Sequence, residues 1–248
     1  MTLWRMELAR LFRTFRWAGL GAAYIAFGLL GPLVTRYQEA LFRNVGGGIT
    51  IEAPPPTPAL AISAFVGNAS QIGLIVTIFI AAGSLAFDAH PEWASFLRTR
   101  APLARILVPK FGVNAAAAAS SFALAAVVAW IVTTALIAPI PATAMLAGIA
   151  YWTLYLVFAV AVVALAAGIV RSVVGVAGLT AVVLLVLPLF GQIAASVKPW
   201  LPSSLVGALV ELIEGTSATS FLRAAVASAL STVVCVTVAV RLLARREV

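Results

Sequence analysis

Six long stretches of mostly apolar residues alternate along the chain with short segments rich in charge, proline or glycine. A helix that crosses about 30 Å of hydrocarbon needs about 20 mostly apolar residues, and each stretch meets or approaches that length. Because backbone groups in lipid must be paired within the chain, and the stretches lack the alternation of a β-barrel, we expect helices. Their approximate bounds are Trp17–Thr35, Ala64–Phe87, Phe111–Ala138, Met145–Val170, Val173–Phe190 and Ala224–Leu243.

The fold class predicted from this pattern is all-α: a polytopic membrane protein with six transmembrane helices in a single domain, residues 1–248. Only Arg171 and Ser172 separate the fourth and fifth stretches, so six spans require a tight turn there. A five-span topology is the main alternative. The first stretch is too long for the core of a signal peptide and no A-x-A site follows it, so we expect a retained span.

Residues 1–16, which precede the first stretch, carry apolar side chains at helical spacing. Arg10 and Arg13 point away from that apolar face. The pattern predicts a basic amphipathic helix that lies along the cytoplasmic lipid surface. A basic flank that only fixes the topology is the alternative. The apolar face consists of Trp4, Leu8, Leu11, Phe12 and Phe15.

Residues 88–110, between the second and third stretches, are the most charged internal segment. Pro91 suits the first turn of a helix, and Glu92 would lie near the positive end of its dipole. The residues that follow at spacings of three and four are Trp93, Phe96, Leu97 and Arg100. This spacing predicts a short cytoplasmic amphipathic helix that ends near Pro102 and suits a groove on a partner protein. A solvated loop is the alternative.

Two further segments interrupt the pattern of spans. Arg36–Ile62 contains a run of three glycines and a run of three prolines, which indicates an extracytoplasmic loop. Residues 191–223, before the last stretch, include the apolar run Leu205–Ile213, and about nine residues cannot cross a bilayer as a helix. Framed by Pro202 and Gly215, this run predicts an interfacial or re-entrant hairpin on the extracytoplasmic side, with its backbone shielded by protein.

Composition and charge placement agree with a membrane protein. Hydrophobic residues make up 63% of the chain and charged residues 10%, against about 25% charged in soluble domains. The net charge is +8, but the basic residues flank the apolar stretches instead of forming a patch, so they indicate topology and not a nucleic-acid partner. With six spans, twelve of the 16 Lys and Arg residues fall on one side, which predicts a multi-pass protein of the cell membrane with both termini in the cytoplasm. The four on the other side are Arg36, Arg43, Lys198 and Arg223.

The chain carries little of the chemistry that enzymes and ion-coupled carriers need. No Asp, Glu or Lys lies at the middle of a predicted span, which disfavours proton or sodium coupling. The sequence has no G-x-x-x-x-G-K-[ST] motif for ATP, and the lone His90 and Cys235 cannot build a metal site or a catalytic group. We therefore expect no catalytic residue, metal or cofactor in this chain. Uncharged polar residues in the spans either join helices or line a substrate path. The candidates for such a path are Asn68, Gln71 and Asn114.

The order of these parts resembles the type 2 permeases of ATP-binding-cassette transporters, the ABC-2 exporter class. That family has an elbow helix, six spans, a coupling helix between spans two and three, and a re-entrant hairpin before the last span, each with a counterpart here. Its coupling segment usually has an acidic residue, an apolar helix, Thr-Pro-x-x-Arg, an apolar pair and a lysine, and Ala101 stands here in place of the threonine. The matching residues are Glu92, Phe96, Leu97, Pro102, Arg105, Ile106, Leu107 and Lys110. The stretch from Pro199 to Ser203 and the basic C-terminus also look like bacterial drug-exporter permeases.

The resemblance implies a permease subunit that exports a hydrophobic or amphipathic small molecule, such as a drug, an antibiotic or a lipid. It implies a second permease copy, identical or related, and a separate ATPase subunit that binds ATP and Mg. The residues that it assigns to contact with the ATPase are Glu92, Trp93, Phe96, Leu97, Arg98, Arg100 and Arg105. A membrane anchor that recruits a cytoplasmic partner without transport is the main alternative. An intramembrane enzyme and a channel or secondary carrier are further alternatives.

Overall fold

The computed structural model describes residues 3–45, 54–86, 102–194 and 196–245. Within these residues the chain is helical and forms no strand. Six helices are long and apolar enough to cross a membrane, which confirms the all-α fold and the count of six candidate spans. Their bounds are Arg16–Ala40, Pro58–Leu85, Leu103–Leu136, Ala142–Ile169, Val173–Ile193 and Ala218–Ala244.

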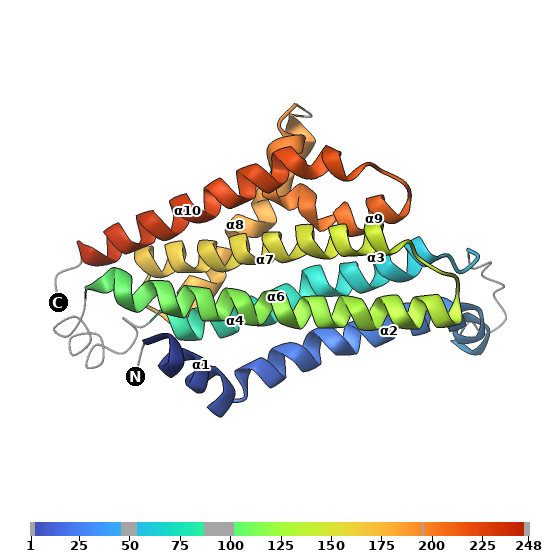
Figure 1. Ribbon diagram of the computed structural model, residues 1–248, viewed down its shortest axis with the longest axis horizontal. Helices are drawn as coiled ribbons and strands as arrows, with labels where there is room; N and C mark the ends of the chain where they lie inside the picture. The colour runs from blue at the N-terminus through green and yellow to red at the C-terminus, as the bar shows by residue number, and fades with distance from the viewer. Residues whose placement is uncertain (1–2, 46–53, 87–101, 195, 246–248) are drawn as a thin grey trace.

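The helices form an elongated bundle whose members run mainly along its long axis (Figure 1). Both chain termini lie at one end of this bundle, hereafter the termini-bearing end, as an even number of spans requires. The α-helices are α1 (Leu3–Arg13), α2 (Arg16–Val45), α3 (Pro58–Asn68), α4 (Leu74–Leu85), α6 (Leu103–Leu136), α7 (Ala142–Ile169), α8 (Val173–Ile193), α9 (Ala208–Ile213) and α10 (Leu222–Ala244). A π-helical turn, η1 (Ala69–Gly73), joins α3 to α4, and three 3₁₀ turns, η3 (Lys198–Trp200), η4 (Pro202–Val206) and η5 (Ala218–Phe221), flank α9.

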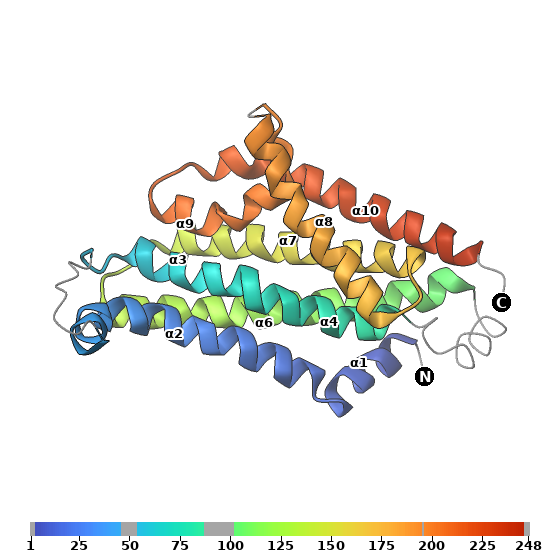
Figure 2. The ribbon, with the colours of Figure 1, turned by 180° about the vertical axis from the view of Figure 1, so that it is seen from behind.

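Helix α7 lies at the centre of the bundle and is the most buried of the six spans. It packs against α6 and α10 along much of its length and also contacts α4, α8 and α9. Helices α8 and α10 are the least buried spans, and Figure 2 shows α8 crossing the bundle obliquely. The two outer helices therefore leave most of their apolar surface for lipid or for another protein.

A stack of aromatic rings fills the core between α3, α6 and α7. The ring of Phe122 on α6 stacks on Trp152 of α7 with ring centroids 4.2 Å apart, and on Phe65 of α3 at 5.4 Å. Tyr24 on α2 meets the edge of Phe122, and its hydroxyl bonds to the hydroxyl of Thr77 at 2.9 Å. Since all four rings are fully buried, they fix the positions of three spans relative to α7.

The turn between the fourth and fifth spans settles the choice between six and five. Helix α7 ends at Ile169, Val170 is extended, and the Ser172 side chain caps α8 by accepting from the backbone N–H of Gly175 at 3.1 Å. A Cβ on Gly175, in the first turn of α8, would lie 2.6 Å from Cγ1 of Val170, so a larger residue there would displace the Val170 side chain. The five-span alternative is wrong, because the chain reverses within three residues.

The predicted loop Arg36–Ile62 is shorter than expected. Helix α2 continues past the apolar stretch to Val45, and α3 begins at Pro58 with the Thr57 hydroxyl accepting from the backbone N–H of Leu60. Proline at the first helical position and threonine before it are a standard helix start. The loop prediction was therefore wrong at both of its ends, while its glycine run lies outside the described residues.

Residues 196–221, between the fifth and sixth spans, fold against α7 instead of crossing the bundle. Leu205, Ala208 and Leu209 are fully buried, and a Cβ on Gly148 of α7 would lie 2.7 Å from Cα of Leu209. The indole N–H of Trp152 donates to the carbonyl of Val206 at 3.1 Å. The segment is thus held against α7 by buried side chains and by this hydrogen bond.

Candidate functional site

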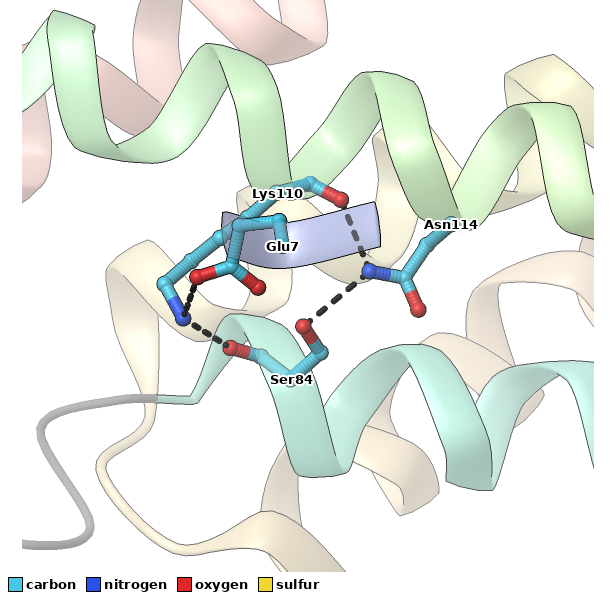
Figure 3. Close-up of polar contacts among 4 residues, drawn as sticks. All are labelled: Glu7, Ser84, Lys110 and Asn114. Atoms are coloured by element: carbon cyan, nitrogen blue, oxygen red, sulfur yellow. Dashed lines mark hydrogen bonds and ion pairs between the residues drawn. The ribbon is translucent and has the colours of Figure 1, made fainter. Parts of the chain in front are cut away.

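A buried polar cluster joins α1, α4 and α6 near the termini-bearing end (Figure 3). The ammonium nitrogen of Lys110 lies 3.0 Å from a carboxylate oxygen of Glu7 and 3.5 Å from the carbonyl oxygen of Ser84. The side-chain amide of Asn114 donates to the Ser84 hydroxyl at 3.0 Å and to the Lys110 carbonyl at 2.7 Å. The four residues Glu7, Ser84, Lys110 and Asn114 are hereafter the polar cluster.

Helix α1 reaches the bundle through two residues, Trp4 and Leu11, and its end is bent back. Leu11 is buried, and the Trp4 ring lies so close to Gly112 that a Cβ there would be 2.5 Å from the ring. The helix ends where Phe15 adopts a left-handed conformation with φ 53°, after the Thr14 hydroxyl bonds to the Arg10 carbonyl. The next helix starts at Arg16, so the sharp bend turns Glu7 towards α6.

Lys110 belongs to a span that is much longer than the membrane is thick. The 34 residues of α6 extend roughly 50 Å, against about 30 Å of hydrocarbon. Lys110 is 4% exposed, so its charge has lost nearly all contact with solvent. A buried cation is tolerated only when it is paired and hydrogen-bonded, and Glu7 supplies the opposite charge.

The Ser84 carbonyl is a natural second partner for this cation. Helix α4 ends at Leu85, so the carbonyl of Ser84 is one of the last four of the helix. Such carbonyls lack a backbone N–H partner within their own helix. A cation at the C-terminal end of a helix also interacts favourably with the helix dipole. Lys110 therefore caps α4 while it pairs with α1.

The surroundings of the polar cluster are strongly basic. Arg10 and Arg16 line the same small cavity as Glu7, Ser84 and Asn114. The guanidinium group of Arg16 also lies near Gly83 of α4, 3.8 Å from where a Cβ on that glycine would be. One carboxylate thus faces three cations, which explains why Glu7 is held against Lys110 instead of turning to solvent.

The polar cluster sits at the base of the segment predicted to couple to a partner. That segment was predicted as residues 88–110, and its last part, residues 103–110, belongs to the first turns of α6. Only Arg105 of the predicted coupling residues is described, and it is exposed in the first turn of α6, apart from the cluster. The predicted residues outside the described part of the chain are Glu92, Trp93, Phe96, Leu97, Arg98 and Arg100.

The three residues predicted for a substrate path are not brought together. Asn114 belongs to the polar cluster and uses both amide hydrogens there. Asn68 and Gln71 lie around the π-helical turn at the middle of the second span, about 20 Å along the helix from Ser84. The Asn68 amide bonds to the carbonyl of Ala64 in its own helix, whereas the Gln71 side chain is exposed and bonds to no described residue.

Sequence reasoning placed neither Glu7 nor Ser84 in a site. One signal was available, because Glu7 is the only acidic residue before Glu39 and lies among four arginines. Lys110 is likewise one of only two lysines in the chain. Glu7 and Lys110 are thus rare residue types beside apolar spans, but only the fold shows that they meet.

Comparison of the sequence with models of known protein families and with curated proteins finds no match. The chain is therefore described by its own structure as an all-α protein with six candidate membrane spans. Its resemblance to the type 2 permeases stays a prediction.

Proposed function

We propose that this chain is the membrane-spanning permease subunit of an ATP-binding-cassette transporter that exports a hydrophobic or amphipathic small molecule. ATP and Mg bind to a separate ATPase subunit, because the sequence contains no phosphate-binding loop of its own. The termini-bearing end faces the cytoplasm, in agreement with the excess of Lys and Arg on that side. A second permease copy, identical or related, completes the membrane part.

The observation that carries this proposal is the polar cluster at the base of the predicted coupling segment, residues 88–110. Its bonds join α4, which precedes the segment, to α6, whose first turns complete it, and to the amphipathic helix α1. A displacement of the segment by a partner is transmitted to α4, α6 and α1 as one unit. Linked rigid elements are what an ATPase needs in order to move the spans between inward and outward arrangements.

The exposed side chain of Gln71 supports the view that this face of the second span meets another protein and not lipid. An amide side chain at mid-membrane depth is costly against lipid, because hydrocarbon offers it no hydrogen bond. Its helix also changes to a π-helical turn at this position, a feature frequent at functional sites. We therefore assign this face to the substrate path between two permease copies.

The segment between the fifth and sixth spans supports the re-entrant element of the proposal. Its apolar side chains are buried against α7 and its Val206 carbonyl is paired with Trp152. Such a segment closes the path at the end opposite the ATPase.

The proposal is tested by a double substitution in the coupling segment, Phe96→Asp with Leu97→Asp, in tagged protein purified from its native membranes. We expect the amount of co-purified ATPase to fall at least about tenfold, because charged groups do not enter an apolar groove. The matched control is Phe12→Asp with Phe15→Asp, which adds the same charges to two exposed phenylalanines, one on α1 and one in the bend after it. A partner retained equally by both variants would remove the coupling role from residues 88–110. A partner without ATPase activity would favour the membrane-anchor alternative.

A further inference from the structure

An apolar groove lies on the outside of the bundle between α7, α8 and α10, with a volume of about 400 Å³. Phe158, Val162 and Ala166 of α7 form its buried floor. Val183 of α8 and Val234 of α10 form its exposed walls. Both outer helices pack on α7 but make few contacts with each other, and Figure 2 shows α8 and α10 on the same side of α7. This α7–α8–α10 groove faces the surroundings of the protein and not the polar cluster.

The length of the groove floor matches one leaflet of a bilayer. On α7 it runs from Ile169, at the termini-bearing end of the helix, to Phe158, which is about 16 Å at the rise of an α-helix. Half of the hydrocarbon thickness is about 15 Å. On α10 the lining residues Leu230 and Cys235 lie deeper, about 14–21 Å from the end of that helix at Ala244. The α10 wall therefore flanks only the inner part of the floor, and an acyl chain that extends from the membrane surface along α7 reaches it.

The mouth of the groove is positively charged. Gly168 of α7 packs on Leu242 of α10, so Arg171 in the turn after α7 and Arg241 on α10 lie at the same end. Both arginines are exposed, and Arg241 follows Val234 by two helical turns on the groove face of α10. Among the described residues, the acidic side chains Glu7, Glu39, Glu211 and Glu214 belong to other elements. The mouth therefore attracts an anion located at the membrane surface.

This pairing of an apolar groove with a basic mouth selects one occupant. A second copy docked groove to groove would bring the same arginines face to face, because a two-fold interface pairs identical surfaces. A neutral lipid would leave the arginines without a counter-charge. We propose that the α7–α8–α10 groove binds one acyl chain of an anionic glycerophospholipid, whose phosphate lies between Arg171 and Arg241. The site does not depend on the transport function.

The test uses two photoreactive lipids in vesicles that contain the full-length chain. One is phosphatidylglycerol and the other phosphatidylcholine, each with the same diazirine group in the acyl chain, and labelled peptides are mapped by mass spectrometry. We expect phosphatidylglycerol to label peptides of α7 and α10 in preference to phosphatidylcholine. Arg171→Gln with Arg241→Gln lowers this labelling by about 25-fold, at about fivefold for each positive charge near the surface. Arg5→Gln with Arg13→Gln, which removes two exposed arginines from α1, leaves it unchanged.

A second variant tests the groove without changing its charge. Ser231→Phe fills the space between α8 and α10 and is expected to abolish the labelling of α7 and α10 by phosphatidylglycerol. Equal labelling by the two lipids, or labelling that survives Ser231→Phe, overturns the proposal. Efficient cross-linking of two chains by a bifunctional thiol reagent at Cys235, the single cysteine, also overturns it, because a second copy would then occupy the groove.

Discussion

The ammonium group of Lys110 and the carboxylate of Glu7 lie 3.0 Å apart, although one belongs to the third span and the other to the amphipathic helix at the start of the chain. The side chain of Lys110 is 5% exposed and that of Glu7 is 17% exposed. The pair therefore fixes the position of α1 against α6 with little competition from water. The same lysine also caps α4, so three elements depend on one cation.

The pair can be tested by substituting each residue with methionine. Glu7→Met leaves Lys110 buried without a counter-charge and is expected to destabilise the fold by about 3–5 kcal/mol. Lys110→Met costs less, because Glu7 is partly exposed and can be hydrated. The double variant is expected to recover most of the loss, since apolar replacements of a buried pair are often neutral. Thermal unfolding of the three variants in detergent gives the coupling energy. Additive losses in the double variant would contradict the pairing.

Asn114 is predicted to transmit movement rather than to contact substrate. Asn114→Leu removes both bonds of its amide and so loosens the link between α4 and α6. We expect the ATPase partner to co-purify as before, while substrate-stimulated ATP hydrolysis falls about tenfold, within the usual range of coupling energies. Ser120→Ala is the control, because the Ser120 hydroxyl bonds only within its own helix. Normal stimulation in Asn114→Leu would exclude this role.

Gln71 is predicted to matter for transport and not for the stability of the single chain. Its side chain is exposed and bonds to no described residue, so Gln71→Leu should leave the melting temperature unchanged or slightly higher. Transport should fall several-fold if the amide faces the path. The neighbouring substitution Ile72→Leu is the control, because Ile72 is also exposed but apolar. A Gln71→Leu variant with full transport would show that this face contacts neither substrate nor a second copy.

Two glycines give a matched test of how residues 196–221 dock. Gly148→Ala places a methyl group 2.7 Å from Cα of Leu209 and should push α9 away from α7, at a cost of about 1–3 kcal/mol. Gly178→Ala adds the same methyl group to a helix where nothing lies within 4 Å, so it should be neutral or stabilising. Melting temperatures measure both effects, and proteolysis of residues 196–221 should increase only in Gly148→Ala. Equal behaviour of the two variants would rule out the close docking of α9.

The spans were predictable because apolarity is a local property of the sequence. Each of the six stretches is long and apolar enough to need a membrane, wherever the others lie. The boundaries were harder, because α2 continues past the apolar stretch to Val45 with polar residues that carry no apolar signal. The start of α3 was missed for a similar reason, although Thr57 and Pro58 form a recognisable helix start.

The polar cluster was only partly predictable, because its bonds join residues that are distant in sequence. Asn114 stood out as a polar residue in a span, but nothing near it in sequence indicates that it reaches Ser84. Glu7 was overlooked because an acid on a basic amphipathic helix normally faces solvent. The bend at Phe15, which turns Glu7 towards Lys110, depends on one unusual backbone conformation that sequence patterns do not reveal.

The most direct test of the proposed function is to purify the unmodified chain from its native membranes in mild detergent and to identify every protein recovered in stoichiometric amount. The account predicts an ATPase with a phosphate-binding loop at one copy per permease chain, and two permease chains in each complex. Recovery of the chain alone, or with a partner that does not hydrolyse ATP, would contradict it.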